Sequence, residues 1–223
     1  MRLKESPVTY VFLILCTVIT LPGIFSTEYY AIFSGEVSDK NWSNYFLMVF
    51  QHGQIDTPLS ILIHYGLNMV LLLLVGRWTE WLIGSTWFLA LSVLAWGTFI
   101  LTQWASGIWI NGSSGIIWAY SPFLLYFSSH SLPEKYHTAI EMAKPLLWIM
   151  WVVVTLFMTF IPLLFNPNHT ILHTLLYGNL FHLVATLTGL LTYFIWKSNT
   201  KNDGSIRGGE ELHEGGSART RNL

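Results

Sequence analysis

The distribution of apolar and polar residues along the chain predicts helices that cross a membrane. Long runs without Asp, Glu, Lys or Arg are separated by shorter polar segments. A membrane-spanning helix needs about 20 apolar residues, whereas a β-barrel strand alternates apolar and polar positions over about 10 residues. The runs here are continuous, so we expect helices. Six segments approach the helical length: residues 8–25, 59–75, 85–104, 114–127, 145–165 and 175–196. The predicted fold class is all-α, a polytopic membrane protein with six transmembrane helices.

Two segments near the amino terminus allow more than one interpretation. Arg2 and Lys4 precede the first run, as they would in a secretory signal peptide. That run is long for a signal peptide and no clear small-residue cleavage site occurs before Thr27, so we interpret residues 8–25 as a retained span. Residues 45–50 are aromatic and apolar but too short to cross a bilayer. We predict an amphipathic segment in the outer membrane interface there, with an ordinary loop as the alternative.

Composition and charge exclude several classes of protein. Charged residues make up 10% of the 223 residues, against about 25% in soluble proteins, and none lies between Lys144 and Lys197. So few charges could not cover the surface of a soluble globule, which excludes a cytosolic enzyme, a nucleic-acid binder and a disordered chain. The net charge of −1 also argues against a nucleic-acid partner. The single cysteine, Cys16, excludes an internal disulfide and a cysteine metal cluster.

The basic residues predict an orientation in the membrane. If both ends are cytoplasmic, Lys40 is the only one of the 11 Lys and Arg residues on the outer side, as the positive-inside rule requires. We therefore expect a multi-pass protein of the cell membrane, in contact with the lipid bilayer and with both termini in the cytoplasm. Residues 1–198 would form the membrane domain, and the polar, Gly-rich residues 199–223 a disordered cytoplasmic tail. The oligomeric state stays open.

Four polar residues stand out inside the predicted spans, where such groups are costly and therefore candidates for function. They are His64 and Asn68 in the second span, Ser114 at the start of the fourth, and His182 in the sixth. All three spans run from outside to inside. At 1.5 Å per residue, the four residues lie within roughly 10–15 Å of the outer surface. A common depth is what one shared site would require.

Helix periodicity predicts which faces meet. His64 and Asn68 lie four residues apart in the second span, so the two share a helix face. Gly115 and Ala119 form a small-x-x-x-small pair in the fourth span, and Ala185 and Gly189 form another in the sixth. Such pairs let helix backbones approach closely. If the fourth and sixth spans pack along these faces, Ser114 and His182 come within hydrogen-bond reach.

These residues have the chemistry of a serine hydrolase. Serine is a weak nucleophile that needs an adjacent base, and His182 could remove the proton of Ser114. The Asn68 amide, the His64 ring and the Ser114 N–H could stabilise the oxyanion of the intermediate. Since no Asp or Glu lies at this depth, the site would be a dyad rather than a triad.

Other interpretations remain open at this point. An intramembrane His can simply hydrogen-bond a neighbouring helix, and a Ser among small residues can serve packing. His52, His169 and His173 also lie on the outer side and could form a metal site, but no H-E-x-x-H pattern occurs. We expect neither a metal nor another cofactor. A small transporter or channel could use the same polar residues as a pathway, but we find no inverted repeat.

The sequence resembles the rhomboid family of intramembrane serine proteases over about residues 42–192. Gly112-Ser113-Ser114-Gly115 matches the G-x-S-G motif of that family. His64-x-x-x-Asn68 is similar to its second-span motif, and His182 followed by Gly189 is similar to its histidine span. Two further stretches resemble family patterns, Phe50-x-His52-Gly53 and Gly76-x-x-x-Glu80-x-x-x-Gly84-Ser85.

The resemblance implies a six-span rhomboid-like bundle that cleaves transmembrane protein substrates near the outer membrane face and needs no cofactor. Ser114 would be the nucleophile and His182 the base, with the oxyanion donors named above. A mobile loop over residues 166–174 would cover the site. Trp118 would stack on the histidine, and Glu80 would be structural. The residues that we predict in helix packing are Gly112, Gly115, Ala119, Ala185 and Gly189.

The sequence departs from the family pattern at several positions. Trp118 replaces the usual Tyr, Ala185 a Gly, and Asn44 lies nearest to where the first loop often has Arg. About seven additional residues separate His52 from His64. The alternative function is a rhomboid-like protein that binds or escorts membrane clients without cutting them, although such proteins typically lack the serine or the histidine.

Overall fold

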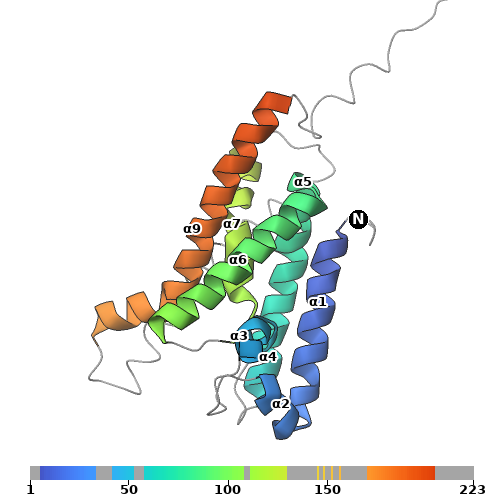
Figure 1. Ribbon diagram of the computed structural model, residues 1–223, viewed down its shortest axis with the longest axis vertical. Coiled ribbons are helices and arrows are strands. Elements are labelled where there is room, and N and C mark those ends of the chain that lie inside the picture. The colour runs from blue at the N-terminus through green and yellow to red at the C-terminus, as the bar shows by residue number, and fades with distance from the viewer. Residues whose placement is uncertain are drawn as a thin grey trace, which may run out of the picture.

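The computed structural model describes residues 6–33, 42–52, 58–107, 111–129 and 170–203, together with positions 145, 148, 152 and 156. Within these ranges the chain is helical and contains no strand (Figure 1). The elements in chain order are α1 (Pro7–Thr20), η2 (Leu21–Ile24), α2 (Thr27–Phe33), α3 (Trp42–Leu47), η3 (Met48–Phe50), α4 (Pro58–Leu71), η4 (Leu72–Gly76), α5 (Arg77–Ile83), α6 (Ser85–Ser106), α7 (Ser114–Ser129) and α9 (Ile171–Asp203).

The all-α class is confirmed for the described residues, and four helical segments are long and apolar enough to cross a membrane. They coincide with the first, second, third and sixth predicted spans. Helix α7 begins at Ser114, where we predicted the fourth span, and is shorter than the others. The predicted fifth span, residues 145–165, lies outside the described residues apart from four positions. The four membrane-length segments are Pro7–Ile24, Ile61–Ile83, Ser85–Ser106 and Asn179–Thr200.

We predicted that the second span ends at residue 75, but the helix continues beyond it. The chain stays helical through the π-helical turn η4 and through α5, and stops at Gly84, whose φ of 80° is accessible to glycine but unfavourable for other residues. Arg77 does not interrupt the helix, since arginine is a favourable helix residue. Its guanidinium lies 5.6 Å from the Tyr10 ring centroid, a cation–π contact. A charge therefore marks the end of the apolar run without ending the helix.

The segment over residues 45–50 is helical, so the ordinary-loop interpretation is wrong there. Met48, Val49 and Phe50 are buried among the helices of the bundle rather than exposed to lipid. Only Phe46 keeps a largely exposed ring, and its carbonyl accepts a hydrogen bond from the Trp96 indole at 3.0 Å. The segment thus forms part of the protein core.

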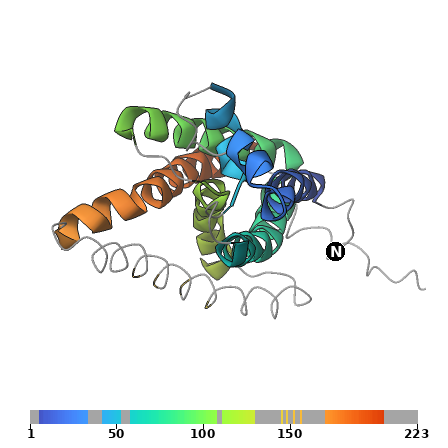
Figure 2. The same ribbon diagram turned by 90° about the horizontal axis from the view of Figure 1, so that it is seen from below.

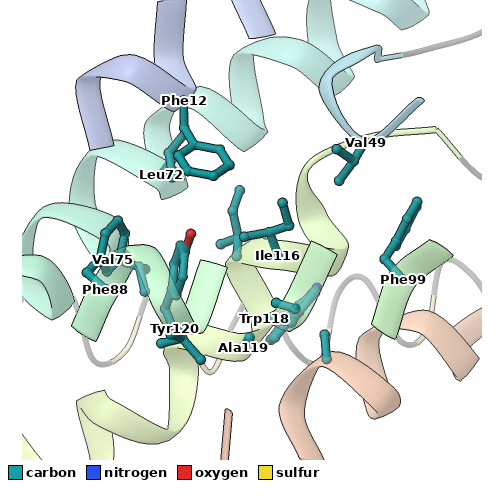
Figure 3. Packing of buried hydrophobic residues seen from close by; sticks show 14 of the residues in the cluster. Phe12, Val49, Leu72, Val75, Phe88, Phe99, Ile116, Trp118, Ala119 and Tyr120 are labelled. Atoms are coloured by element: carbon teal, nitrogen blue, oxygen red, sulfur yellow. The ribbon is translucent and has the colours of Figure 1, made fainter. Parts of the chain in front are cut away.

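Helix α7 runs through the middle of the bundle, with α6, α9 and α4 around it (Figures 1 and 2). Trp118, Ala119 and Tyr120 are almost fully buried in the core shown in Figure 3. By contrast, large apolar side chains such as Leu94 and Leu191 are exposed on the outside of the bundle, 53% and 64% respectively. An apolar exterior around a packed core is typical of helices that face lipid.

Contact between α7 and α9 follows the predicted small-residue faces in part. Ala119 and Ala185 are buried, and a Cβ added to Gly189 would overlap the Ala119 carbonyl oxygen. Gly115 has its nearest neighbour on another helix: a Cβ there would overlap the Phe99 ring of α6. Gly115 lies one helical turn before Ala119, and at that point of α7 the nearest neighbour is α6.

Glu80 lies buried at the end of the bundle where α1 begins. Its carboxylate accepts hydrogen bonds from the Val8 and Thr9 N–H groups at 3.0 and 2.8 Å, and from the hydroxyls of Thr9 and Ser85 at 2.7 Å each. The first N–H groups of a helix have no intrahelical acceptor, and the Ser6 side chain does not cap α1. Glu80 therefore supplies the missing cap from a distant helix.

We expect Glu80→Ala to lower the free energy of unfolding by about 3 kcal/mol, since it leaves buried donors without their charged acceptor. Glu80→Gln should lose less, because one oxygen acceptor remains. Thermal or denaturant unfolding in detergent measures both. Glu28→Ala, which removes an exposed carboxylate in the first turn of α2, is the matched control. Equal losses for Glu80→Ala and Glu28→Ala would show that the cap does not stabilise the fold.

Candidate active site

Ser114 and His182 come from helices far apart along the chain and meet inside the bundle. His182 Nε2 lies 3.2 Å from Ser114 Oγ, within the range of a hydrogen bond. Ser114 is the first residue of α7, and His182 lies on the part of α9 that packs against it. The His182 ring is buried, while Ser114 keeps partial exposure. The two side chains thus have the separation that proton transfer between them requires.

The turn before α7 depends on Gly112. Its φ is 119°, a backbone conformation that L-residues with a side chain rarely adopt. Its N–H donates to the Met48 carbonyl at 3.1 Å, and a Cβ there would lie 3.0 Å from the His64 ring. We predicted Gly112 as a helix-packing residue, but it lies in the turn before α7 and lets that turn pass close to His64.

Trp118 lies beside the histidine, one turn after Ser114. The Trp118 and His182 ring centroids are 5.4 Å apart and the ring planes are inclined by 59°. The predicted stacking is therefore a tilted contact rather than a parallel one. Tilted arrangements avoid the repulsion between two negative ring faces, and the buried indole still limits how far His182 can turn.

The predicted oxyanion residues lie on α4. Asn68 is buried, and its Nδ2 donates to the His64 carbonyl at 2.9 Å. This bond uses one of two amide hydrogens, so one remains for a ligand. His64 lies against the turn at Gly112, close to the start of α7. The Ser114 N–H belongs to the first turn of α7, where amides have no intrahelical acceptor.

No acidic residue among the described part of the chain hydrogen-bonds to His182, whose Nδ1 is buried without a protein partner. The arrangement is thus a serine–histidine pair without a third carboxylate. Glu80 contacts the beginning of α1 instead. Within the described ranges, no group of three or more His, Cys, Asp or Glu is placed to hold a metal ion. His169 and the side chain of His173 lie outside those ranges.

From the sequence, His52 is a possible metal ligand and part of the Phe50-x-His52-Gly53 stretch, but not a residue of the serine–histidine site. Its ring is fully buried, and Nε2 lies 3.1 Å from the Ser113 backbone N and 2.9 Å from Ser113 Oγ. Nδ1 lies 3.2 Å from Thr20 Oγ1. Two sequence signals concern this residue: its position directly after the apolar residues 45–50, which indicates burial, and the Phe50-x-His52-Gly53 stretch, which resembles a family pattern. Neither identifies Ser113 as its partner.

Two predicted segments, the loop over residues 166–174 and the carboxyl-terminal tail, differ from the structure in their bounds. Of the loop over residues 166–174, residues 166–169 lie outside the described residues, and α9 already begins at Ile171. The predicted loop therefore includes residues 171–174, which belong to α9. The tail was predicted to begin at residue 199, yet α9 continues to Asp203. Residues 204–223 lie outside the described ranges.

Comparison of the chain with protein-family models, with curated proteins and with solved structures finds no match. The geometry of the residues around Ser114 is therefore what supports a functional conclusion.

Proposed function

We propose that the protein is a six-span, rhomboid-type intramembrane serine endopeptidase. The observation that carries the proposal is the 3.2 Å separation of His182 Nε2 and Ser114 Oγ at the buried contact between α7 and α9. A polar pair inside an apolar helical bundle is costly to bury, which makes it a candidate for function. A nucleophile beside a base is the arrangement that hydrolysis of an acyl group requires.

The chemistry follows from the two side chains. Ser114 Oγ attacks the carbonyl carbon of the scissile peptide bond while its proton moves to His182 Nε2. The C–N bond then breaks, the proton passes to the leaving amine, and an ester on Ser114 remains. His182 next removes a proton from a water molecule, which attacks the ester and releases a carboxylic acid and the free serine. Serine and imidazole supply nucleophile and base, so the proposal includes no cofactor.

Negative charge on the intermediate needs donors at the start of α7. The Ser114 N–H, the His64 ring and the remaining Asn68 amide hydrogen are the candidates, because α4 passes beside the turn that leads into Ser114. The charge forms in a water-poor environment, where each donor stabilises it more than it would in bulk water. Loss of one donor should therefore slow the chemical step.

The proposed substrates are transmembrane segments of other proteins. A peptide bond inside a helix is shielded by its hydrogen bonds, so segments with small or helix-weakening residues near the outer membrane face would be cut most readily. We place both termini in the cytoplasm of a cell-membrane protein, which puts Ser114 near the outer face. The oligomeric state is not part of the proposal.

The direct test is cleavage by purified protein in liposomes. A panel of single-span substrates that differ in small and helix-weakening residues is incubated with the wild type and with Ser114→Ala, and the cut is mapped by mass spectrometry. We expect cuts in the outer half of the spanning segment with the wild type alone. Cleavage of no substrate, or equal cleavage by both proteins, would contradict the proposal.

Labelling with a fluorophosphonate separates an enzyme from a rhomboid-like binding or escort protein. An activated serine reacts with the reagent, whereas a serine that only packs does not. We expect the wild type to be labelled and Ser114→Ala to lose the label. A wild type that binds membrane clients but remains unlabelled would favour the binding function.

Replacement of Asn68 by Ala should lower kcat by roughly 10–1,000-fold with a smaller change in KM, because an oxyanion donor acts mainly in the transition state. His64→Ala should behave similarly. Steady-state kinetics on the best substrate measures both, and Asn199→Ala, an exposed position on α9, is the matched control. Asn68 would be excluded from the oxyanion site if its variant kept the wild-type kcat.

A further inference from the structure

We propose that His52 is a positioning residue of the same site, whose neutral ring holds the Ser113 amide and thereby fixes the turn that carries Ser114. The inference rests on the proposed protease activity and adds a second histidine to what that activity requires. It also implies that acidification switches the site off by protonating His52.

The hydrogen bonds determine which nitrogen of His52 carries the proton. A backbone N–H can only donate, so the Ser113 N–H needs a lone pair on Nε2, 3.1 Å away. Nδ1 must then be the protonated nitrogen, and it donates to Thr20 Oγ1 at 3.2 Å. The Thr20 hydroxyl in turn donates to the Phe50 carbonyl at 2.9 Å. Each donor in this chain has an acceptor only in the neutral Nδ1–H form of His52.

This chain of bonds links the ends of α1 and η3 to the start of α7. Thr20 lies at the end of α1, Phe50 at the end of η3, and Ser113 directly before Ser114. Because Ser113 accepts the first helical hydrogen bonds of α7 through its carbonyl, a shift of its peptide unit also moves the Ser114 N–H. His52 therefore influences both the nucleophile and a proposed oxyanion donor without touching a substrate.

Protonation of His52 would remove the acceptor and set an N–H on Nε2 against the Ser113 N–H. Among the described residues, the groups around the ring carry no compensating negative charge. They are the rings of His64 and Tyr65 on α4, at centroid distances of 5.3 and 5.9 Å, and Thr20 and Cys16 on α1, the latter near Ser113. Burial, and secondarily the charge of His64, lower the pKa of His52 well below its usual range, so the neutral form holds at neutral pH.

Two variants of His52 separate the effect of the hydrogen-bond acceptor from the effect of side-chain size. Glutamine places an oxygen acceptor near the position of Nε2 and cannot be protonated, whereas leucine fills similar space without an acceptor. We expect His52→Leu to lose about 100-fold in kcat, comparable with the loss of an oxyanion donor, with little change in KM, and His52→Gln to stay within about tenfold of wild type. Thermal unfolding of each variant reports whether it is folded.

The pH profile supplies a readout that a purely structural role would not change. Two histidines must be neutral in the wild type, His52 and the base His182, so log kcat/KM should fall on the acid side with a slope approaching 2. In His52→Gln only the base remains, and the slope should become 1. An unchanged acid slope in an active His52→Gln would overturn the proposal.

A measurement on the wild type needs no variant to fold. Nitrogen-15 NMR of the histidine rings distinguishes the two tautomers, and we expect His52 with the proton on Nδ1. A proton on Nε2 at neutral pH, or a folded His52→Leu with wild-type kcat, would overturn the positioning role while leaving the protease intact. If the wild type neither cleaves nor takes the fluorophosphonate label, the proposed function itself fails, and the catalytic role of His52 with it.

Discussion

Replacement of Ser114 by Ala should abolish peptide-bond cleavage and leave the helical bundle folded. The variant removes the atom that forms the ester intermediate, and in serine hydrolases such a loss costs on the order of 10⁴–10⁶ in kcat. The hydroxyl contributes one hydrogen bond to His182, so the free energy of unfolding should change by only about 1 kcal/mol. Cleavage assays and thermal unfolding of the same preparation measure the two effects separately.

The partner variant and the control sharpen this test. His182→Ala should be about as inactive as Ser114→Ala, and the double variant no worse than either, because the two residues act as one unit. Ser121→Ala, on the same helix but hydrogen-bonded only to the Trp118 carbonyl, should keep its activity. A Ser114→Ala protein with wild-type turnover would exclude Ser114 as the nucleophile.

Gly189→Ala should have the second-largest effect, although it lies about two turns from His182 along α9. The added methyl has no room beside the Ala119 carbonyl oxygen, and a backbone atom cannot swing aside as a side chain can. Helices α7 and α9 must separate locally, which we expect to cost about 1–3 kcal/mol of stability, as overpacking does. A displacement of about 1 Å between Ser114 and His182 would lower activity on the order of 10²-fold.

The chain contains matched controls for this substitution. A Cβ at Gly66 or Gly97 would meet nothing within 4 Å, and both glycines lie inside helices. Gly66→Ala and Gly97→Ala make the same chemical change without crowding and should be neutral or slightly stabilising. If Gly189→Ala unfolds no more easily than these controls and cleaves as fast, close approach of α7 and α9 does not hold the pair together.

Much of the architecture was predictable from the sequence, because uncharged apolar runs of membrane length have few alternative structures. The start of α7, and the side of α9 that contacts α7 at Ala119, were also predictable from the sequence. Small-residue spacing identifies a face but not the neighbour that it meets. Gly115 shares the spacing of Ala119 and yet faces Phe99, since the crossing of three helices decides which one approaches.

The features that sequence reasoning missed depend on contacts between distant segments. Glu80 caps a helix that begins more than 70 positions earlier in the chain, and His52 holds a turn at Ser113 through a backbone amide. Neither interaction has a local pattern, because the acceptor and the donor are brought together only by the packed fold. The π-helical turn in the second span is likewise not visible in a uniform run of Leu and Val.

The π-helical turn η4 lets one continuous helix carry a buried polar side chain at each end of the bundle, Asn68 and Glu80. Asn68, Leu72, Gly76 and Glu80 are all buried at steps of four residues. In a straight α-helix each such step drifts about 40° past a full rotation, so Glu80 would lie about 120° around the axis from Asn68. The extra residue accommodated by η4 cancels most of that drift. Shortening the helix by one residue here would rotate either the Asn68 amide or the Glu80 carboxylate out towards lipid.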